Sequence, residues 1–225
     1  MDKQLILSTM LQLLRGFEFT FGIFVFTLLF SLPLGLLVAR GRMARNSVIS
    51  TVVRIYISIM RGTPLMLQLL LVYFGPYYLF GISTGNAVIG PFNYRFIATV
   101  IGFSLNYAAY FAEIFRGGIQ SMSRGQYEAA QVLGFSKSQT YFRIILPQVI
   151  KNVLPSVANE VITLVKDTSL AQVLAVTEMF TVAKALASAQ VSVMPFVVAG
   201  VFYYIMNAII EVSLNRIEKS MSYYS

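Results

Sequence analysis

Polar and ionisable side chains recur at helical spacing inside stretches that are otherwise apolar. In one stretch Asn106, Tyr110 and Glu113 stand at positions i, i+4 and i+7, which places them on one face of a helix. Arg61 and Gln68 are separated by the same seven residues in another stretch. Such groups donate or accept hydrogen bonds or carry a charge, so they are candidates to bind a polar solute, an ion or each other.

A third stretch carries the densest polar set. Its residues at i, i+4, i+7 and i+8 are Asn159, Thr163, Lys166 and Asp167. An ionised side chain near the middle of a bilayer costs about 2.5–3.5 kcal/mol even on a lenient scale, so each must face a cavity, a partner or a helix end. Three polar faces on three helices predict a shared, water-filled interior.

The residues needed for many catalytic and metal sites do not occur in this sequence. It contains no cysteine and no histidine, which excludes disulfides, thiolate or histidine metal sites and Ser-His-Asp triads. No Gly-x-x-x-x-Gly-Lys-Ser/Thr loop is present, so the chain lacks the motif that cradles the phosphates of ATP. We predict no catalytic residue, no metal ligand and no cofactor bound by this chain.

The composition requires a bilayer as the solvent for most of the chain. Hydrophobic residues make up 57% and charged residues 12% of the 225 residues, and the mean hydropathy is +0.72. These values lie well beyond those of a soluble domain. The net charge of +8 fits basic loops that fix orientation in a membrane, so we do not expect nucleic acid as a partner.

The hydropathy pattern predicts an all-α membrane protein that forms a single domain over 1–225. Each apolar stretch is long enough to cross a bilayer as a helix. The five expected spans cover about residues 17–39, 52–80, 96–115, 148–176 and 196–214. A turn-rich loop is expected at 81–95, and an external loop or short helix at 177–195.

The second of these spans contains residues that disfavour a continuous helix. Arg61, Gly62, Thr63 and Pro64 interrupt the apolar run. Proline cannot donate a backbone hydrogen bond, so the helix is expected to kink or break there. The freed carbonyls offer a hinge or a ligand, and the alternative is an ordinary packing kink.

Basic residues are distributed unevenly between the loops. The loop at 40–54 has four arginines and no acid, and the polar segment at 116–143 has Arg116, Arg124, Lys137 and Arg143 against Glu128. The loops at 81–95 and 177–195 show no such excess. The positive-inside rule therefore places both basic loops in the cytoplasm, the N-terminus outside and the C-terminus inside.

The polar segment is expected to contain a short helix at about 124–134. Ser123 and Gln126 have capping-box spacing, and Glu128 lies in the first turn, where the helix dipole favours an acid. Tyr127, Ala130 and Gly134 share a face, and Gly134 can end the helix in a left-handed conformation. By local physics alone, this helix either docks a partner through small residues or simply faces water.

The wider spacing of this segment has a known counterpart. Glu128-Ala129-Ala130 is followed at fixed distances by Gly134, Ile144 and Leu146-Pro147. This resembles the EAA loop of membrane permeases from ABC importers, in particular those for polar amino acids of the histidine/glutamine/arginine group. Further motifs of that group match at 61–65, Gln68, 104–106, 112–118, 125–130, 145–148, 159–160 and 166–170. The likeness covers roughly residues 16–215.

The resemblance implies a type I ABC importer permease in the cytoplasmic membrane of a bacterium. Its partners would be an ABC ATPase dimer that binds ATP and Mg²⁺, a second permease (identical or related), an extracytoplasmic amino-acid-binding protein and membrane lipid. The residues implied in coupling to the ATPase are Tyr127, Glu128, Ala129, Ala130, Gly134, Leu146 and Pro147.

The resemblance also assigns a role to the polar faces. A free amino acid is a zwitterion, and Lys166 and Asp167 would supply a cation and an anion for it. The residues named above as candidate ligands are Gln68, Asn106, Tyr110, Glu113, Asn159, Thr163, Lys166 and Asp167. The alternative is internal pairing of Lys166 with Glu160 or Glu113, and of Asp167 with Arg61, which would stabilise packing or a closed gate.

A different class of transporter uses the same acids. A secondary transporter or channel would employ Glu113, Glu160 and Asp167 as proton or sodium sites. We find no inverted repeat of the kind typical of such proteins, and the EAA spacing would then have no purpose. The importer is therefore the preferred interpretation.

Overall fold

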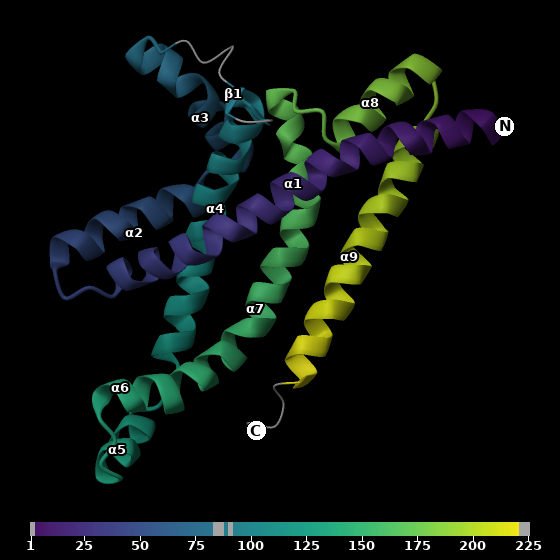
Figure 1. Cartoon of the computed structure of the whole chain (residues 1–225). Coiled ribbons are helices and arrows are strands. Elements are labelled where there is room, and N and C mark those ends of the chain that lie inside the picture. Colours follow the sequence, from purple (N-terminus) through teal and green to yellow (C-terminus); the bar gives the residue numbers. More distant parts are fainter. Residues whose placement is uncertain (1–2, 83–87, 90–91, 221–225) are drawn as a thin grey trace.

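The computed structural model describes residues 3–82, 88–89 and 92–220, and helices make up nearly all of this part of the chain (Figure 1). A bilayer requires this, because every backbone polar group in hydrocarbon must be satisfied within its own segment. The helices are α1 (Lys3–Arg42), α2 (Ser47–Gly62), α3 (Leu65–Phe80), α4 (Tyr94–Gln120), α5 (Arg124–Val132), α6 (Lys137–Gln139), α7 (Leu146–Asp167), α8 (Met179–Gln190) and α9 (Met194–Ser220).

Three helices are individually long and apolar enough to cross a membrane. They are α1, α4 and α9, and the number rises to five if each of two bent helix pairs counts as one span. The expected all-α membrane architecture is confirmed. The bent pairs are α2 with α3, and the segment Lys137–Leu174 with α8.

The predicted break at Thr63-Pro64 is an elbow of 113° between α2 and α3. Thr63 has an extended backbone, and Pro64 starts α3 without a backbone donor to continue the helix before it. The fourth expected span also differs from one straight helix. Residues 148–176 contain most of α7 followed by a 3₁₀ turn at Thr168–Leu174, and a π-turn at Thr140–Ile145 directly precedes α7.

Side-chain caps fix where several helices begin. Asn46 Oδ1 accepts hydrogen bonds from the backbone nitrogens of Val48 and Ile49 at the start of α2. Asn93 does the same for α4, and Glu178 for α8. Of the expected loop at 81–95, strands β1 (Val88–Ile89) and β2 (Phe92–Asn93) form a short antiparallel pair, and residues 83–87 and 90–91 lie outside the described part.

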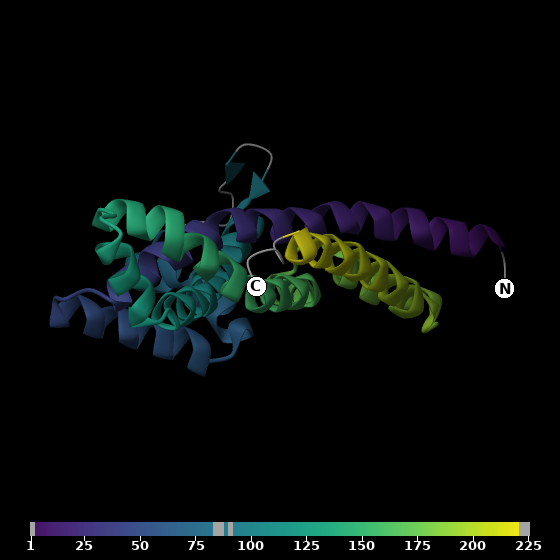
Figure 2. The ribbon, with the colours of Figure 1, turned by 90° about the horizontal axis from the view of Figure 1, so that it is seen from below.

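The core lies where α1 crosses α4. A Cβ on Gly35 of α1 would lie 2.8 Å from Phe111 Cβ, so glycine permits this close approach. Phe103, Tyr107 and Phe111 of α4 are almost fully buried there, together with Leu164 of α7. Figure 1 shows α1 running diagonally across α4 and on past α8 and α9 toward the N-terminus. In Figure 2 the outer part of α1 extends alongside α9.

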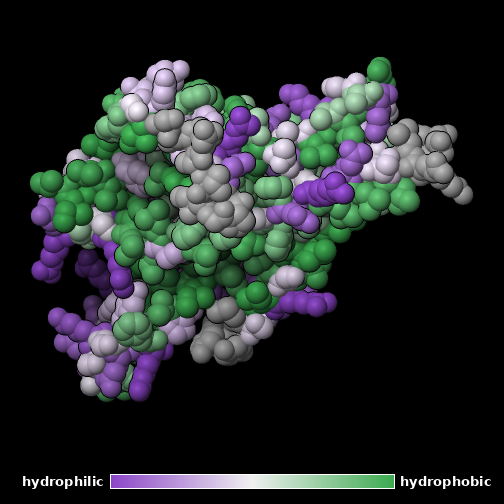
Figure 3. Space-filling model, turned by 45° about the horizontal axis from the view of Figure 1, so that its top comes forward, coloured by the Kyte–Doolittle hydropathy of each residue, from purple (hydrophilic) through white to green (hydrophobic). Residues whose placement is uncertain are grey.

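The outer surface matches a lipid environment. In Figure 3 hydrophobic side chains cover the middle of the visible face, and hydrophilic ones gather toward its margins. Helix α9 is the most exposed of the three long apolar helices, because only 11% of its most apolar 18-residue stretch is buried. The segment 177–195, expected as a loop or short helix, forms α8, which packs against α1 and α9.

Candidate functional site

Two buried amides hold the elbow between α2 and α3. The Nε2 group of Gln68 donates to Met60 O at 2.9 Å, to Thr63 O at 3.1 Å and to Thr63 Oγ1 at 2.8 Å. Asn106 Nδ2 on α4 donates to Met60 O at 3.0 Å and to Gln68 Oε1 at 2.9 Å. The elbow frees these carbonyls, and the amides satisfy them in place of a continuing helix.

A polar cavity lies beside this elbow, between α4 and α7. Its volume is about 240 Å³. The residues that line it are Thr63, Leu65, Asn106, Tyr107, Tyr110, Glu160, Thr163 and Asp167. We call it the Asp167 cavity. It brings together Asn106 and Tyr110 from one predicted polar face with Thr163 and Asp167 from another. Arg61 and Gln68, the third predicted face, do not line it.

The Asp167 cavity is acidic. Glu160 and Asp167 line it, and none of its described lining residues is basic. Tyr107, which the sequence analysis did not single out, donates its hydroxyl to Asp167 Oδ2 at 2.7 Å and fixes that carboxylate. Lys166 is exposed and is not among the residues that line the cavity. A cationic or ammonium group would find complementary charge here.

Arg61 stands at the edge of this cavity. Its guanidinium carbon lies 5.3 Å from the centre of the Tyr110 ring, within the range of a cation–π interaction. The internal pairs considered from the sequence for Lys166 and Asp167 do not form. Within the described residues, the only acid–base contact under 4 Å joins Arg116 to Glu113.

Glu113 belongs to a different cavity from the other predicted ligands. That cavity has a volume of about 310 Å³ and is lined by Glu113, Ile114, Gly117, Gly118, Ser121, Asn152, Val153 and Ser156. We call it the Glu113 cavity. Arg116 Nε donates to both carboxylate oxygens of Glu113 at 3.2 Å, and Arg116 Nη1 donates to Gln120 Oε1 at 2.6 Å. The prediction of one interior that includes Glu113 is therefore corrected.

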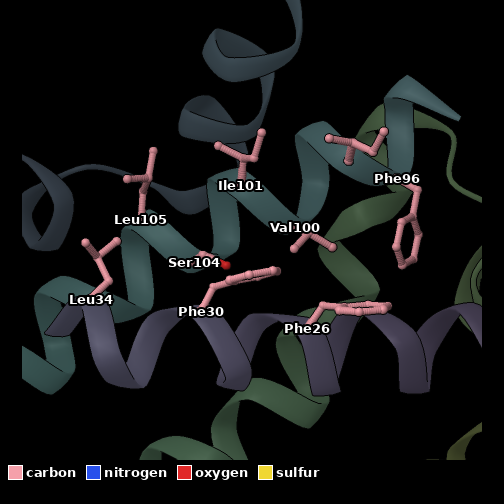
Figure 4. A pocket seen from close by; sticks show the side chains of 9 residues that line it. Phe26, Phe30, Leu34, Phe96, Val100, Ile101, Ser104 and Leu105 are labelled. Carbon is pink, nitrogen blue, oxygen red and sulfur yellow. The ribbon is translucent and has the colours of Figure 1, made fainter. Parts of the chain in front are cut away.

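A third cavity, between α1 and α4, differs in chemistry. It has a volume of about 470 Å³, and Ser104 is its only polar lining residue (Figure 4). The phenyl rings of Phe26 and Phe30 and the side chain of Val100 enclose it. Such a groove offers nothing to orient a polar solute, so it is not the candidate site.

The polar segment forms α5, as expected, and α5 begins at Arg124. The predicted capping box at Ser123 and Gln126 is wrong, because the Ser123 side chain makes no cap hydrogen bond. The box occurs instead at Ser136 and Gln139, which start α6. Gly134 has φ +78°, which confirms its predicted left-handed conformation after the helix end.

The exposed side of α5 is different from the face predicted. Ala130 is only 1% exposed and packs inside the chain, against the π-turn segment. Glu128 and Ala129 are exposed, and Tyr127 is 40% exposed. Val132 and Leu133, which sequence reasoning missed, are 88% and 73% exposed. The sequence signal for this exposed apolar surface was a pair of apolar residues directly before Gly134 in an otherwise polar segment.

The remaining predicted docking residues lie at the start of α7. Leu146 and Pro147 are partly buried, and both follow directly on the π-turn at Thr140–Ile145. Gln148 Nε2 donates to Ile144 O at 2.8 Å and to Gln126 Oε1 of α5 at 3.4 Å. These residues position α5 relative to α7 and expose little surface themselves.

The sequence and the fold both have counterparts among known proteins. Residues 31–223 match the family described as binding-protein-dependent transport system inner membrane component. The nopaline transport system permease protein NocM of Agrobacterium fabrum is 35% identical over 212 residues, which cover 94% of this chain and 88% of NocM. The L-cystine transport system permease protein TcyB of Bacillus subtilis is 33% identical, with 93% and 86% covered.

Solved structures show the same fold. A chain from an amino acid ABC transporter crystallised with histidines has a TM-score of 0.84 and 29% identity, over 98% of this chain and 99% of that one. A chain of the MetNI methionine ABC transporter in an inward-facing conformation has a TM-score of 0.70 at 15% identity, over 99% and 100%. At that identity the second likeness concerns the fold alone.

Proposed function

Because this chain belongs to the family of inner membrane components of binding-protein-dependent transport systems, we propose that it is the membrane-spanning subunit of an ATP-driven importer of polar amino acids. It is a multi-pass protein of the bacterial inner membrane. The observation that carries the proposal is the exposed helix α5, which stands apart from the membrane-spanning helices and presents Tyr127, Val132 and Leu133.

The chain needs an ATPase in trans. It lacks a loop that could cradle ATP, so ATP and Mg²⁺ belong to partner chains and this subunit is not itself the enzyme. The exposed apolar side chains at the end of α5 fit a hydrophobic cleft on such a partner. Glu128 and Ala129 lie on the same exposed part of the helix, and Ala130, Leu146 and Pro147 hold it in position.

The polar surface of α7 supports a second permease, identical or related. Asn159, Thr163 and Lys166 share one face of α7 and are exposed on the isolated chain. Polar and charged groups at this depth cannot face lipid without a large cost. A second permease placed against this face would enclose them in a common path, of which the Asp167 cavity is one half.

The substrate is a polar amino acid held at the Asp167 cavity. Glu160 and Asp167 would accept its ammonium group. Lys166, which is exposed and follows Val165 directly before Asp167 in the sequence, would attract its carboxylate. Asn106, Tyr110 and Thr163 contribute hydrogen-bonding groups along the wall of the cavity. Asn159 lies one turn before Thr163 on the exposed face of α7. Gln68 does not line the cavity, and it positions Asn106 by accepting a hydrogen bond from the Asn106 amide.

The transport cycle follows from two states that bind ATP differently. An extracytoplasmic binding protein delivers the amino acid to the outer side. ATP binding closes the ATPase dimer, draws the two α5 helices together and turns the path from inward-facing to outward-facing. The Arg61–Pro64 elbow, next to the cavity, is where α2 and α3 would change their relative angle.

The docking proposal is tested by co-purification. A tagged chain expressed with its ATPase should retain it, and Glu128→Lys or Gly134→Asp should release it while the permease still inserts in the membrane. Glu218→Lys, an equally exposed acid at the end of α9, is the matched control and should retain the ATPase. Uptake that persists without any ATPase, driven by an ion gradient, would refute the importer.

The substrate site is tested by thiol protection, because the chain has no cysteine of its own. Asp167→Cys and Asn106→Cys are modified with a thiol reagent in the assembled complex, with and without amino acid. Protection of either supports the Asp167 cavity, and modification at an unchanged rate in both contradicts it. The ion-coupled alternative is less favoured, since Glu113 is paired with Arg116 and separated from Glu160 and Asp167.

A further inference from the structure

We propose that the Glu113 cavity is a second binding site for the imported amino acid, on the cytoplasmic side of the Asp167 cavity. Glu113 would receive the ammonium group of the amino acid, and Asn152 and Ser156 would donate hydrogen bonds to its carboxylate. This inference rests on the proposed function, because it assigns a second station on the same path.

The two cavities follow one another along the same pair of helices. Helices α4 and α7 pack together and run in opposite directions, and both lead toward α5 and α6 (Figure 1). On α4, Tyr110 lines the Asp167 cavity and Glu113 lines the Glu113 cavity, one turn closer to α5. On α7, Glu160 lines the first cavity and Ser156 the second, again one turn closer to α5.

The lining groups of the Glu113 cavity suit a zwitterion. Asn152 and Ser156 stand at i and i+4 of α7 and share a face. Both are exposed, and their side chains make no hydrogen bond with any other residue in the described part of the chain. The Glu113 carboxylate accepts hydrogen bonds only from Arg116 there, which leaves lone pairs for an ammonium group.

The floor of the cavity joins the path to the docking helix. A Cβ on Gly118 would lie 2.1 Å from Val153 Cγ1, so α4 and α7 touch here only because this residue is glycine. Ser121 donates to Gly118 O at 2.9 Å and closes the end of α4, and α5 begins three residues later at Arg124. A ligand bound across α4 and α7 therefore bridges the two helices to which α5 is attached.

The consequence is feedback by the transported product. An amino acid that has accumulated in the cytoplasm would fill the Glu113 cavity of the inward-facing state and stabilise that state relative to the outward-facing one. ATP-driven uptake would then slow as the internal concentration rises.

The test uses Gly117→Cys as the reporter. Gly117 lines the cavity and is exposed. A Cβ at this position would have no other atom within 4 Å, so a cysteine side chain fits there. The complex with its ATPase is reconstituted in liposomes without nucleotide, and a thiol reagent is added from the cytoplasmic side. The probe is whichever of L-glutamine, L-arginine, L-cystine and L-glutamate stimulates ATP hydrolysis. Thr163→Cys reports on the Asp167 cavity in parallel.

We expect the probe to slow modification of Gly117→Cys. Glu113→Gln in the same background should raise the concentration needed for protection by about tenfold or more, because a charge-assisted hydrogen bond is lost. Arg116→Gln breaks the same ion pair but keeps the carboxylate, so it should leave protection in place. Thr163→Cys should remain protected in the Glu113→Gln variant.

Two results would overturn the inference while the importer stands. One is protection of Thr163→Cys by a probe that leaves the rate at Gly117→Cys unchanged. The other is an equal loss of protection in Arg116→Gln and Glu113→Gln, which would assign Glu113 to the ion pair alone. Failure of the proposed function has a different signature: none of the probes stimulates ATP hydrolysis, and neither cysteine is protected.

Discussion

Two buried polar side chains in this protein donate hydrogen bonds to backbone carbonyls that the break between α2 and α3 leaves without a helical partner. Gln68 is 7% exposed and Asn106 is 4% exposed, and both donate to carbonyls at the α2–α3 elbow. Spacing placed Gln68 on a polar helix face, but it could not show that the amide ends on Met60 and Thr63. That contact exists only because the helix breaks, and the angle of the break is a tertiary property.

Replacing Gln68 by leucine should weaken the folded state. The carbonyl oxygens of Met60 and Thr63 lose a donor, and Asn106 loses an acceptor, so we expect a decrease of about 2–4 kcal/mol in the free energy of unfolding. Thermal denaturation of the purified complex measures this. Gln12→Leu, at an exposed position of α1, is the control. An equal decrease in both variants would contradict the stabilising role of the Gln68 hydrogen bonds at the elbow.

Glu178 is the buried acid that sequence reasoning passed over. It is 0% exposed, accepts from the backbone nitrogens of Phe180 and Thr181 at 2.7 Å, and accepts from the Tyr203 hydroxyl at 3.1 Å. The sequence showed only an acid in a mixed segment. Its burial depends on α1, α8 and α9 converging, which local spacing does not encode.

Glu178→Ala should therefore be among the most destabilising single changes. It removes the cap of α8 and the link from α8 to α9, and we expect a loss of about 3 kcal/mol of stability. The thermal midpoint of the complex reports it, with Glu218→Ala as the exposed control. A midpoint unchanged from the native protein would show that the carboxylate is replaceable by water.

At the scale of elements, hydropathy located the helices well and their bends less well. The expected spans at 96–115 and 196–214 lie inside α4 and α9, whose ends extend a few residues further. The expected span at 52–80 is two helices that meet at 113°. The proline predicts a break, because it lacks a backbone donor, but it does not determine the angle between the two helices. The expected capping box at Ser123 was wrong, because residue spacing does not show which way a serine side chain turns: Ser123 begins α5 without a side-chain hydrogen bond, and the box forms at Ser136 and Gln139.

Alanine substitution should affect stability in opposite directions at a glycine that makes a close helix contact and at one that makes none. Gly35→Ala forces a methyl group to within 2.8 Å of Phe111 Cβ and should destabilise the α1–α4 contact by about 1–3 kcal/mol. Gly200→Ala on α9 meets no atom within 4 Å and should stabilise by up to about 1 kcal/mol, because alanine is the better helix former. Thermal midpoints of the two variants should move in opposite directions.

The exposed end of α5 separates folding from docking. Leu133 is 73% exposed, so Leu133→Asp should leave the thermal midpoint of the isolated permease unchanged. Its affinity for the ATPase should fall by about tenfold or more, since an apolar contact is replaced by a charge that must lose water. Titration of ATPase onto the immobilised permease measures the affinity. An unchanged affinity would move the docking surface away from Leu133.

For the whole molecule, the distribution of polar surface defines which sides meet water and which meet lipid. Helix α7 exposes Asn159, Thr163 and Lys166, whereas α9 exposes apolar side chains such as Ile209, at 62%. The polar faces of the candidate site could be found from spacing alone. Their division into two cavities could not, since it depends on how Gly118 lets α7 approach α4.

This distribution predicts the reactivity of introduced cysteines. In the assembled complex, Asn159→Cys should react with a water-soluble thiol reagent about tenfold or more faster than Ile209→Cys, because the reactive thiolate does not form in hydrocarbon. Both positions are exposed on the isolated chain, so exposure alone would predict similar rates. Similar rates in the complex would contradict the assignment of a wet path to α7.

Helix α1 is unbroken over 40 residues, which makes it about 60 Å long, roughly twice the thickness of the hydrocarbon core. Its outer part is tied to α8 by Thr20, which accepts from Met179 N, and by Thr9, which accepts from Gln190. Its inner end is tied to α2 by Arg42 and Ser50. One helix thus joins the two sides of the membrane, so a displacement of its outer part would reach the inner arginines through the backbone itself. Pro33, inside α1, removes one backbone donor and is the position where that helix would bend.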